Sequence, residues 1–241
     1  MNTLQTQKLI ALSLALGAGL LALATPVKAI QDINPDVVQL LNVQFDSRPV
    51  AQIEAGDFHF APGQTAPVHT HHAPAIGYVA KGRIIYQVEG RRPVILNEGD
   101  AFYEPAGPRI LRFDNASATS EAIFIDYNFQ QAGEPFIDFE VPPTENIDRR
   151  AFTTVPMAGQ VMSNVYVSAV NIAAGGSLTP DRQGLLVAYV AEGSVELRLD
   201  GSTPQTFDAG DSIPLSKAPS EITFANASDR LRAKLITFTG Y

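Results

Sequence analysis

The sequence predicts an all-β protein built from two tandem copies of one barrel or sandwich unit. From Val50 onward, short runs of β-branched and aromatic residues are separated by Gly, Pro, Asn and Asp at regular intervals. This rhythm is typical of β-sandwiches and β-barrels. The same pattern occurs twice along the chain, and long amphipathic helical patterns are absent from the sequence. A tandem duplication of one β unit explains these observations together.

The duplication is visible in turn residues and apolar strand positions at a constant shift of 111 positions, without a gap. The matching segments are Tyr78-Val79-Ala80-Lys81-Gly82 with Tyr189-Val190-Ala191-Glu192-Gly193, Gly99-Asp100 with Gly210-Asp211, and Asn115-Ala116-Ser117 with Asn226-Ala227-Ser228. All 4 histidines of the chain lie in the first copy. We therefore expect one functional site, in the first copy.

The N-terminus has the pattern of a secretory signal peptide. Lys8 precedes an apolar run from Leu9 to Leu23, and Val27-Lys28-Ala29 supplies the residues that a signal peptidase reads. We predict a signal peptide over residues 1–29 and a periplasmic or secreted bacterial protein with no integral membrane segment after cleavage. An uncleaved anchor is the alternative, although the run is shorter than the roughly 20 apolar residues that span a bilayer.

Composition excludes several classes of function. The chain has 0 Cys, so neither disulfides nor thiol chemistry are available. Its formal net charge of -8 and its scattered basic residues disfavour nucleic acid, whose recognition needs clustered Lys and Arg. We therefore expect a small-molecule ligand or substrate as the partner, and a homodimer stays open as an alternative to a monomer.

The expected elements follow in chain order. Asn34 is a plausible cap for one or two helical turns that reach Leu41. Arg83 to Val88 and Val94 to Leu96 flank Glu89-Gly90-Arg91-Arg92 and predict a hairpin. The second copy predicts the same hairpin, beginning with Ser194 to Leu199.

A Pro- and acid-rich stretch connects the two copies. It includes Gly133-Glu134-Pro135 and Val141-Pro142-Pro143-Thr144-Glu145-Asn146, which indicate a linker packed along the surface. We place the boundary near residue 145, with an N-terminal barrel over 30–145 and a C-terminal barrel over 146–241.

The candidate chemistry lies in His69-Thr70-His71. Residues two apart on a β-strand point to the same face, so both imidazoles are expected in one cavity. Two histidines from one strand of a barrel wall provide half of a metal site.

These residues resemble the motifs of the cupin superfamily, and the duplication makes the chain similar to a bicupin. The first motif of that family is matched by Gly63, His69, His71 and Gly82, and the second by Gly99, Pro105 and Gly107, with Asn115 one place late. The resemblance implies two jelly-roll barrels, and it covers the chain from about Gly56 to the C-terminus. Cupins carry out many unrelated functions, so the resemblance does not imply one reaction.

The sequence departs from the family pattern at two ligand positions. Ala75 stands where the family has a metal-binding Glu, and Ile110, or Leu111 if the register shifts, replaces the third His. Two ligands hold a divalent ion much more weakly than three or four. The expected cofactor is therefore a divalent transition metal (Fe, Mn, Ni, Cu or Zn) that is weakly held or absent.

Three residues are candidates for a third ligand: His59, Glu104 and His72. His59 qualifies only if Phe58 and Phe60 face away from the cavity, and His72 only if its strand breaks before Pro74. Glu104 and Tyr103, just before Pro105, are expected to lean toward the mouth of the site. The remaining expected cavity residues are Thr70, Ala75 and Ile110.

Three functions are open at this point. The first is an exported bicupin that binds a small molecule, with at most a weak metal site in its N-terminal barrel. The second is a metal-dependent enzyme, namely an oxygenase, isomerase or lyase acting on a small organic acid or sugar derivative. The third is a structural or storage-like protein without an active site. A third side chain that reaches His69 and His71 would favour the enzyme.

Overall fold

The protein was described with a computed structural model that covers residues 35–180, 184–215 and 221–241. The predicted signal peptide over residues 1–29 lies outside the described residues. All helix or strand elements assigned in the described residues are β-strands, with no helix among them. This confirms the predicted all-β class. Over the same residues, no helix is long and apolar enough to cross a membrane.

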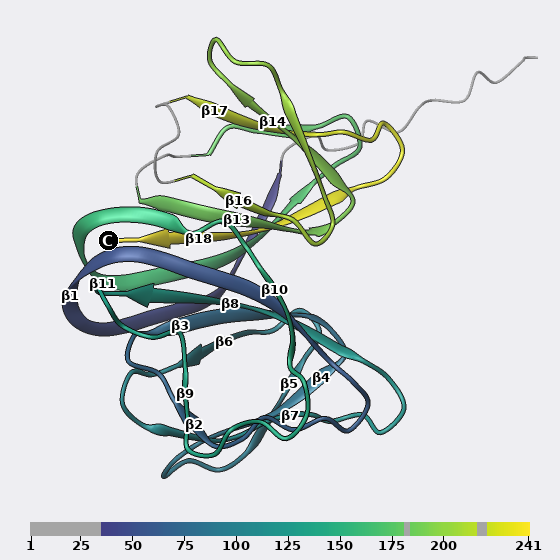
Figure 1. Cartoon of the computed structure of the whole chain (residues 1–241). Coiled ribbons are helices and arrows are strands. Elements are labelled where there is room, and N and C mark those ends of the chain that lie inside the picture. Colours follow the sequence, from purple (N-terminus) through teal and green to yellow (C-terminus); the bar gives the residue numbers. More distant parts are fainter. Residues whose placement is uncertain (1–34, 181–183, 216–220) are drawn as a thin grey trace, which may run out of the picture. The chain divides into compact units, whose positions relative to one another are not determined.

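The largest sheet has nine antiparallel strands (Figure 1). They are β1 (Asp36–Phe60), β3 (Ala75–Lys81), β6 (Ala101–Glu104), β8 (Ala122–Gln130), β10 (Asp148–Ala151), β11 (Val155–Ile172), β13 (Leu185–Glu192), β16 (Ser212–Pro214) and β18 (Ala233–Gly240). The order is β16-β13-β18-β11-β1-β8-β3-β6, and β10 also pairs with β1. Strands of both copies therefore belong to one sheet.

Two smaller sheets complete the architecture. The sheet of the first copy contains the strands β2 (His69–Thr70), β4 (Arg83–Val88), β5 (Val94–Asn97), β7 (Arg109–Asn115) and β9 (Asp138–Phe139), in the order β5-β4-β7-β2-β9. The sheet of the second copy contains the strands β12 (Ser177–Leu178), β14 (Ser194–Leu199), β15 (Gln205–Asp208) and β17 (Ile222–Asn226), in the order β12-β17-β14-β15. The antiparallel pairs β4–β5 and β14–β15 confirm both predicted hairpins.

The expectation of helical turns up to Leu41 is wrong. Strand β1 already runs from Asp36, which pairs with Asn171 of β11. Val37 and Val38 favour an extended backbone because they are β-branched, and the pairing with β11 supplies their hydrogen-bond partners. Tertiary pairing therefore overrides the local helix signal.

Strand β1 joins the two copies. Its residues Asp36 to Ile53 pair with β11, and residues Gln52 to Phe60 pair with β8. The buried core around this strand contains side chains of both copies, and the rings of Tyr127 and Phe238 lie 4.5 Å apart. Because β10 also pairs with β1, residues after position 145 contact the first copy. The boundary near residue 145 stays a prediction.

The repeat is reproduced in hydrogen bonds as well as in sequence. Asn115 of β7 and Asn226 of β17 are both buried, and the side-chain amide nitrogen of each donates to three backbone carbonyls. The acceptors are Phe60, Ala61 and Ser120 in the first copy, and Ile172, Ala173 and Leu231 in the second. Each asparagine therefore ties a strand end to the loop beside it.

We expect Asn115→Ala and Asn226→Ala each to lower the free energy of unfolding by about 2–4 kcal/mol, because each leaves buried carbonyls without a donor. Urea denaturation measures the change. Asn97→Ala, at an exposed position, is the control and should change it by less than about 0.5 kcal/mol. Equal effects of all three substitutions would contradict the shared role of the two buried asparagines.

Candidate metal centre

His69 and His71 enter the same cavity of the first copy. His69 lies on the short strand β2, which is paired on one side with β7 and on the other with β9. His71 follows as an isolated bridge to Ala106. Both side chains are almost fully buried, and their ring centroids lie 5.3 Å apart. The alternation of the extended chain brings the two imidazoles together.

Backbone carbonyls orient both rings. Nδ1 of His69 lies 2.8 Å from the carbonyl oxygen of Pro67, and Nδ1 of His71 lies 3.1 Å from that of Phe136. An Nδ1–H that donates to a carbonyl leaves the Nε2 lone pair free to bind a metal. The backbone therefore favours an available Nε2 on His69, whereas Nδ1 of His71 also lies 3.0 Å from the side-chain nitrogen of Asn128.

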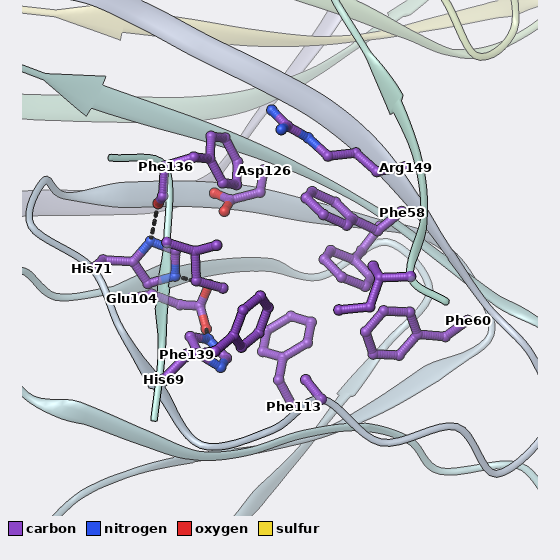
Figure 2. Close-up of a pocket in the computed structure, with 14 residues that line it drawn as sticks. Phe58, Phe60, His69, His71, Glu104, Phe113, Asp126, Phe136, Phe139 and Arg149 are labelled. Carbon is purple, nitrogen blue, oxygen red and sulfur yellow. Dashed lines mark hydrogen bonds and ion pairs between the residues drawn. The ribbon is translucent and has the colours of Figure 1, made fainter. Parts of the chain in front are cut away.

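Glu104, the last residue of β6, faces the two Nε2 atoms (Figure 2). Its Oε1 lies 3.6 Å from Nε2 of His69, and its Oε2 lies 3.2 Å from Nε2 of His71. One ligand atom from each of the three residues fits within a 4.8 Å group, and all three residues are buried. The structure thus places a third metal-ligand type beside the two histidines.

The position of Glu104 is related to the loss of the glutamate at Ala75. In the antiparallel pair β3–β6, the Cα partner of Ala75 is Glu104. Directly opposite residues of such a pair project on the same face with Cβ atoms about 5 Å apart. The small side chain of Ala75 leaves room, and the carboxylate enters the site from the neighbouring strand.

Two buried atoms of the group make no hydrogen bond of normal geometry: Nε2 of His71, which is in ion-pair contact with Oε2 of Glu104, and Oε1 of Glu104. A buried polar atom without a partner costs about 1–3 kcal/mol, and more if it is charged. A divalent cation between the imidazoles and the carboxylate would satisfy both atoms. Two histidines and one carboxylate with open positions form a ligand set suited to non-haem iron(II), and zinc accepts the same donors.

Electrostatics couples the two unpartnered residues. Burial disfavours the charged form of each, but their mutual attraction outweighs it. The pKa of His71 is raised to about 9, and the pKa of Glu104 is lowered to about 2 by the positive charge of His71. Without a metal, the pair is an ion pair at neutral pH, and a bound metal ion takes the place of the proton.

The cavity beside these residues has a volume of about 230 Å³ and mostly apolar walls. Its lining comprises His69, His71 and Glu104 together with Phe58, Phe60, Ala66, Phe113, Phe124, Asp126, Phe136, Ile137, Phe139, Ile147 and Arg149. Four of these, Phe136, Ile137, Phe139 and Ile147, follow the first copy's last long strand. Residues between and after the two predicted linker segments therefore close the cavity, while Val141 to Asn146 are themselves exposed or half-buried.

His59 and His72 lie outside the group of ligand atoms. Phe58 and Phe60 face the cavity, so His59 faces the other way and contacts Glu121 at 3.2 Å. His72 is exposed, and its Nε2 lies 2.6 Å from the carboxylate of Asp138. Both positions follow from strand alternation.

The other expected cavity residues occupy different surroundings. Thr70 is half-buried on β2, and neither it nor Ala75 lines the cavity, although Ala75 is buried. Tyr103 lines a separate polar depression with Arg48 and Glu134. Ile110 is fully buried in the aromatic core and is the Cα partner of His69. Ile110 rather than Leu111 is thus the inward residue of β7.

Sequence reasoning missed Asp126 and Arg149 in the cavity wall. The repeat counterpart of Asp126 is Thr237, so the comparison of the two copies gives no sign of a function at this position. The available signal was a carboxylate inside the nine-residue strand β8, where its neighbours are apolar or amide residues. Burial raises the pKa of Asp126 to about 7 despite the nearby positive charge of His71.

Comparison with known proteins identifies the family. The cupin domain profile matches residues 56–127, so this segment of the first copy is a cupin domain. No curated protein matches the chain in sequence.

Solved structures share the fold at low sequence identity. A salicylate 1,2-dioxygenase from Pseudaminobacter salicylatoxidans is 16% identical with a TM-score of 0.54, over 79% of this chain and 71% of the other. Vicilin from Corylus avellana (hazelnut) is 12% identical with a TM-score of 0.55, over 83% and 85%. An enzyme and vicilin thus resemble the chain equally, so the likeness establishes the fold alone.

Exchanging the carboxylate between the paired strands tests the ligand set. We expect Glu104→Ala to weaken zinc or iron binding by at least about tenfold to a hundredfold, since loss of even an outer-shell partner has such an effect. The double variant Ala75→Glu/Glu104→Ala should regain part of that affinity, because the two positions face each other. Competition with a chelator measures both.

Glu98→Ala removes an exposed carboxylate of the same copy and should leave the affinity unchanged. Equal binding by Glu104→Ala and Glu98→Ala would contradict the assignment of Glu104 as a ligand.

The pKa shifts predict how the stability of the metal-free protein depends on pH. A raised His71 pKa contributes stability below its ordinary value of 6.5, and this stability is lost as the pH rises through about 9. We therefore expect the free energy of unfolding, measured in urea with a chelator present, to fall between pH 7 and pH 9. Glu104→Gln removes the attraction and should flatten that fall. The same slope in both proteins would contradict the coupling.

Proposed function

We propose that the protein is a metal-dependent cupin enzyme whose N-terminal barrel holds one divalent transition metal ion on His69, His71 and Glu104. The observation that carries this proposal is the convergence of three metal-ligand side chains with two buried atoms that have no hydrogen-bond partner. Of the hypotheses open from the sequence, the enzyme gains most, because a third side chain of metal-ligand type lies beside the two histidines. Iron(II) suits this ligand set best.

The metal would supply Lewis-acid chemistry and, as iron, the activation of oxygen. The chain's own residues would hold the ion and select the substrate. Carbonyls of Pro67 and Phe136 keep the imidazoles oriented, and the phenylalanine walls exclude water from the reacting atoms. The apolar lining favours a small, largely apolar organic molecule over a sugar derivative.

A second candidate is a small-molecule-binding protein without catalysis. The ion pair between His71 and Glu104 favours it, because this pair partly satisfies itself without a metal and a metal must displace its proton. A storage-like protein without a site, the third hypothesis, does not account for the unpartnered atoms inside the cavity.

Export is part of the proposal. The charged residue Lys8, the apolar run from Leu9 to Leu23 and the small residues before Ile30 support a periplasmic or secreted location. Detection of a mature N-terminus at Ile30 in a bacterial periplasmic fraction tests it, and an intact Met1 terminus in the cytoplasm would contradict it.

The metal content of the mature protein decides between the two candidates. We expect the chain from Ile30, purified without a His tag, to carry near-stoichiometric iron or another transition metal by mass spectrometry. His69→Ala/His71→Ala should lose it, because one carboxylate alone binds a divalent ion weakly. Sub-stoichiometric metal in both proteins, even after incubation with excess ions, would reject the enzyme and leave the binding protein.

A further inference from the structure

Asp126 and Arg149 form a second polar pole of the cavity wall, in addition to the metal ligands (Figure 2). Asp126 of β8 is 3% exposed, and its Oδ1 is buried without a hydrogen-bond partner. Arg149 of β10 has a buried Nε that also lacks a partner. Phenylalanines line the cavity together with these two residues. An acceptor and a donor are therefore left unmet in an otherwise apolar wall.

The charge of Arg149 is already used by other groups. Its Nη2 lies 2.8 Å from Oε1 of Glu54, and the guanidinium carbon lies 4.1 Å from the centroid of the Phe136 ring. The other carboxylate oxygen of Glu54 accepts from Gln130 at 3.0 Å. The guanidinium is thus fixed in place, and its buried Nε–H is a donor without a protein partner.

Gly56 brings Arg149 next to Asp126. A Cβ at Gly56 would lie 2.9 Å from Nε and 3.2 Å from Cγ of Arg149, so the arginine occupies the space of the missing side chain. In the pair β1–β8, the Cα partner of Gly56 is Asp126. Side-chain positions on one face of such a pair are about 5 Å apart. One ligand group is therefore within reach of both unmet atoms.

A hydroxyl group has the chemistry that this pole requires. Its oxygen accepts a hydrogen bond from Nε–H, and its hydrogen is donated to the carboxylate. A hydroxyl both donates and accepts, so it pairs with Nε–H and with Asp126 whether that carboxyl group is ionised or protonated, and an apolar group satisfies neither atom. Because the unmet groups are buried, a ligand that pairs both is favoured over an analogue that lacks the hydroxyl.

The size of the cavity limits the rest of the ligand. A cavity of about 150 Å³ accommodates benzene, and this one has a volume of about 230 Å³. One aromatic ring with one or two small substituents fits that space between the phenylalanine side chains.

We propose that Asp126 and Arg149 are specificity-determining residues that bind the hydroxyl group of a single-ring aromatic ligand in the cavity beside the metal ligands. This deepens the proposed function and rests on it for the metal. Neither residue belongs to the metal-ligand group, so recognition of the hydroxyl is testable without a metal.

Isothermal titration of the chelator-treated mature protein with phenol and with toluene tests the proposal. The two probes have the same ring and differ in the group that meets the polar pole. We expect phenol to bind at least about tenfold more tightly than toluene, since a buried unpaired polar group costs that much or more. Equal affinities would overturn the proposal.

Variants identify the residues that cause the preference for phenol over toluene. Asp126→Leu preserves the approximate shape of the side chain, and it should abolish the preference for phenol while toluene still binds. Arg149→Lys keeps the charge near Glu54 without the Nε–H and should reduce the preference. Thr237→Val, at the buried repeat counterpart of Asp126, is the control and should leave it unchanged. A preference that persists in Asp126→Leu would place the hydroxyl at the histidines and overturn the proposal.

Toluene binding reports whether the cavity of each variant is intact. If Asp126→Leu does not fold, Arg149→Lys carries the same test, and an unchanged preference there overturns the proposal. Metal content, measured in parallel by mass spectrometry, distinguishes failure of the proposed enzyme from failure of the proposed hydroxyl-binding role of Asp126 and Arg149. If the protein prefers phenol but holds no stoichiometric metal, only the enzyme proposal is rejected. If it holds stoichiometric metal but does not prefer phenol, only the hydroxyl-binding proposal is rejected.

Discussion

The antiparallel pairing of β1 is the interaction on which both copies depend. One part of this 25-residue strand completes the sheet of the second copy through β11, and the other part forms a wall of the first barrel through β8. The side chains packed around it form one core, with Tyr127 against Phe238. Because residues of a strand alternate between faces, the register of β1 also sends Phe58 and Phe60 into the cavity and His59 away from it. The geometry of the candidate site thus begins with this strand.

The candidate metal centre combines groups that are costly to bury separately. His71 and Glu104 are almost fully buried, and their attraction holds both in charged forms when no metal is bound. Such a pair is weak evidence for stability, because its desolvation cost offsets the attraction. Its retention in the interior of a barrel is instead consistent with a functional role. The same argument applies to Asp126 and Arg149, which line the apolar cavity and carry buried atoms without a hydrogen-bond partner.

The two copies show how duplication separates structure from chemistry. Asn115 and Asn226 retain the same hydrogen bonds to backbone carbonyls, since any barrel of this kind must satisfy its strand ends. The core of the second copy is largely aliphatic, with Val170, Ile172 and Leu235 among its buried residues. The first copy instead has an aromatic lining that surrounds polar groups. The partner carbonyls of the two asparagines make Ile172 the structural counterpart of Phe60.

The sequence by itself determined the all-β class, the duplication, both hairpins and the pair His69/His71, because turn residues, strand alternation and motif spacing are local properties. It named Glu104 among three candidates but was unable to choose, since the choice depends on which residue lies opposite Ala75 in the β3–β6 register. The start of β1, the closing of the cavity by the segment around Phe136, and the meeting of Asp126 with Arg149 were decided only by tertiary structure. Each of these depends on pairing between strands that are far apart in the chain, and local sequence carries no information about such partners.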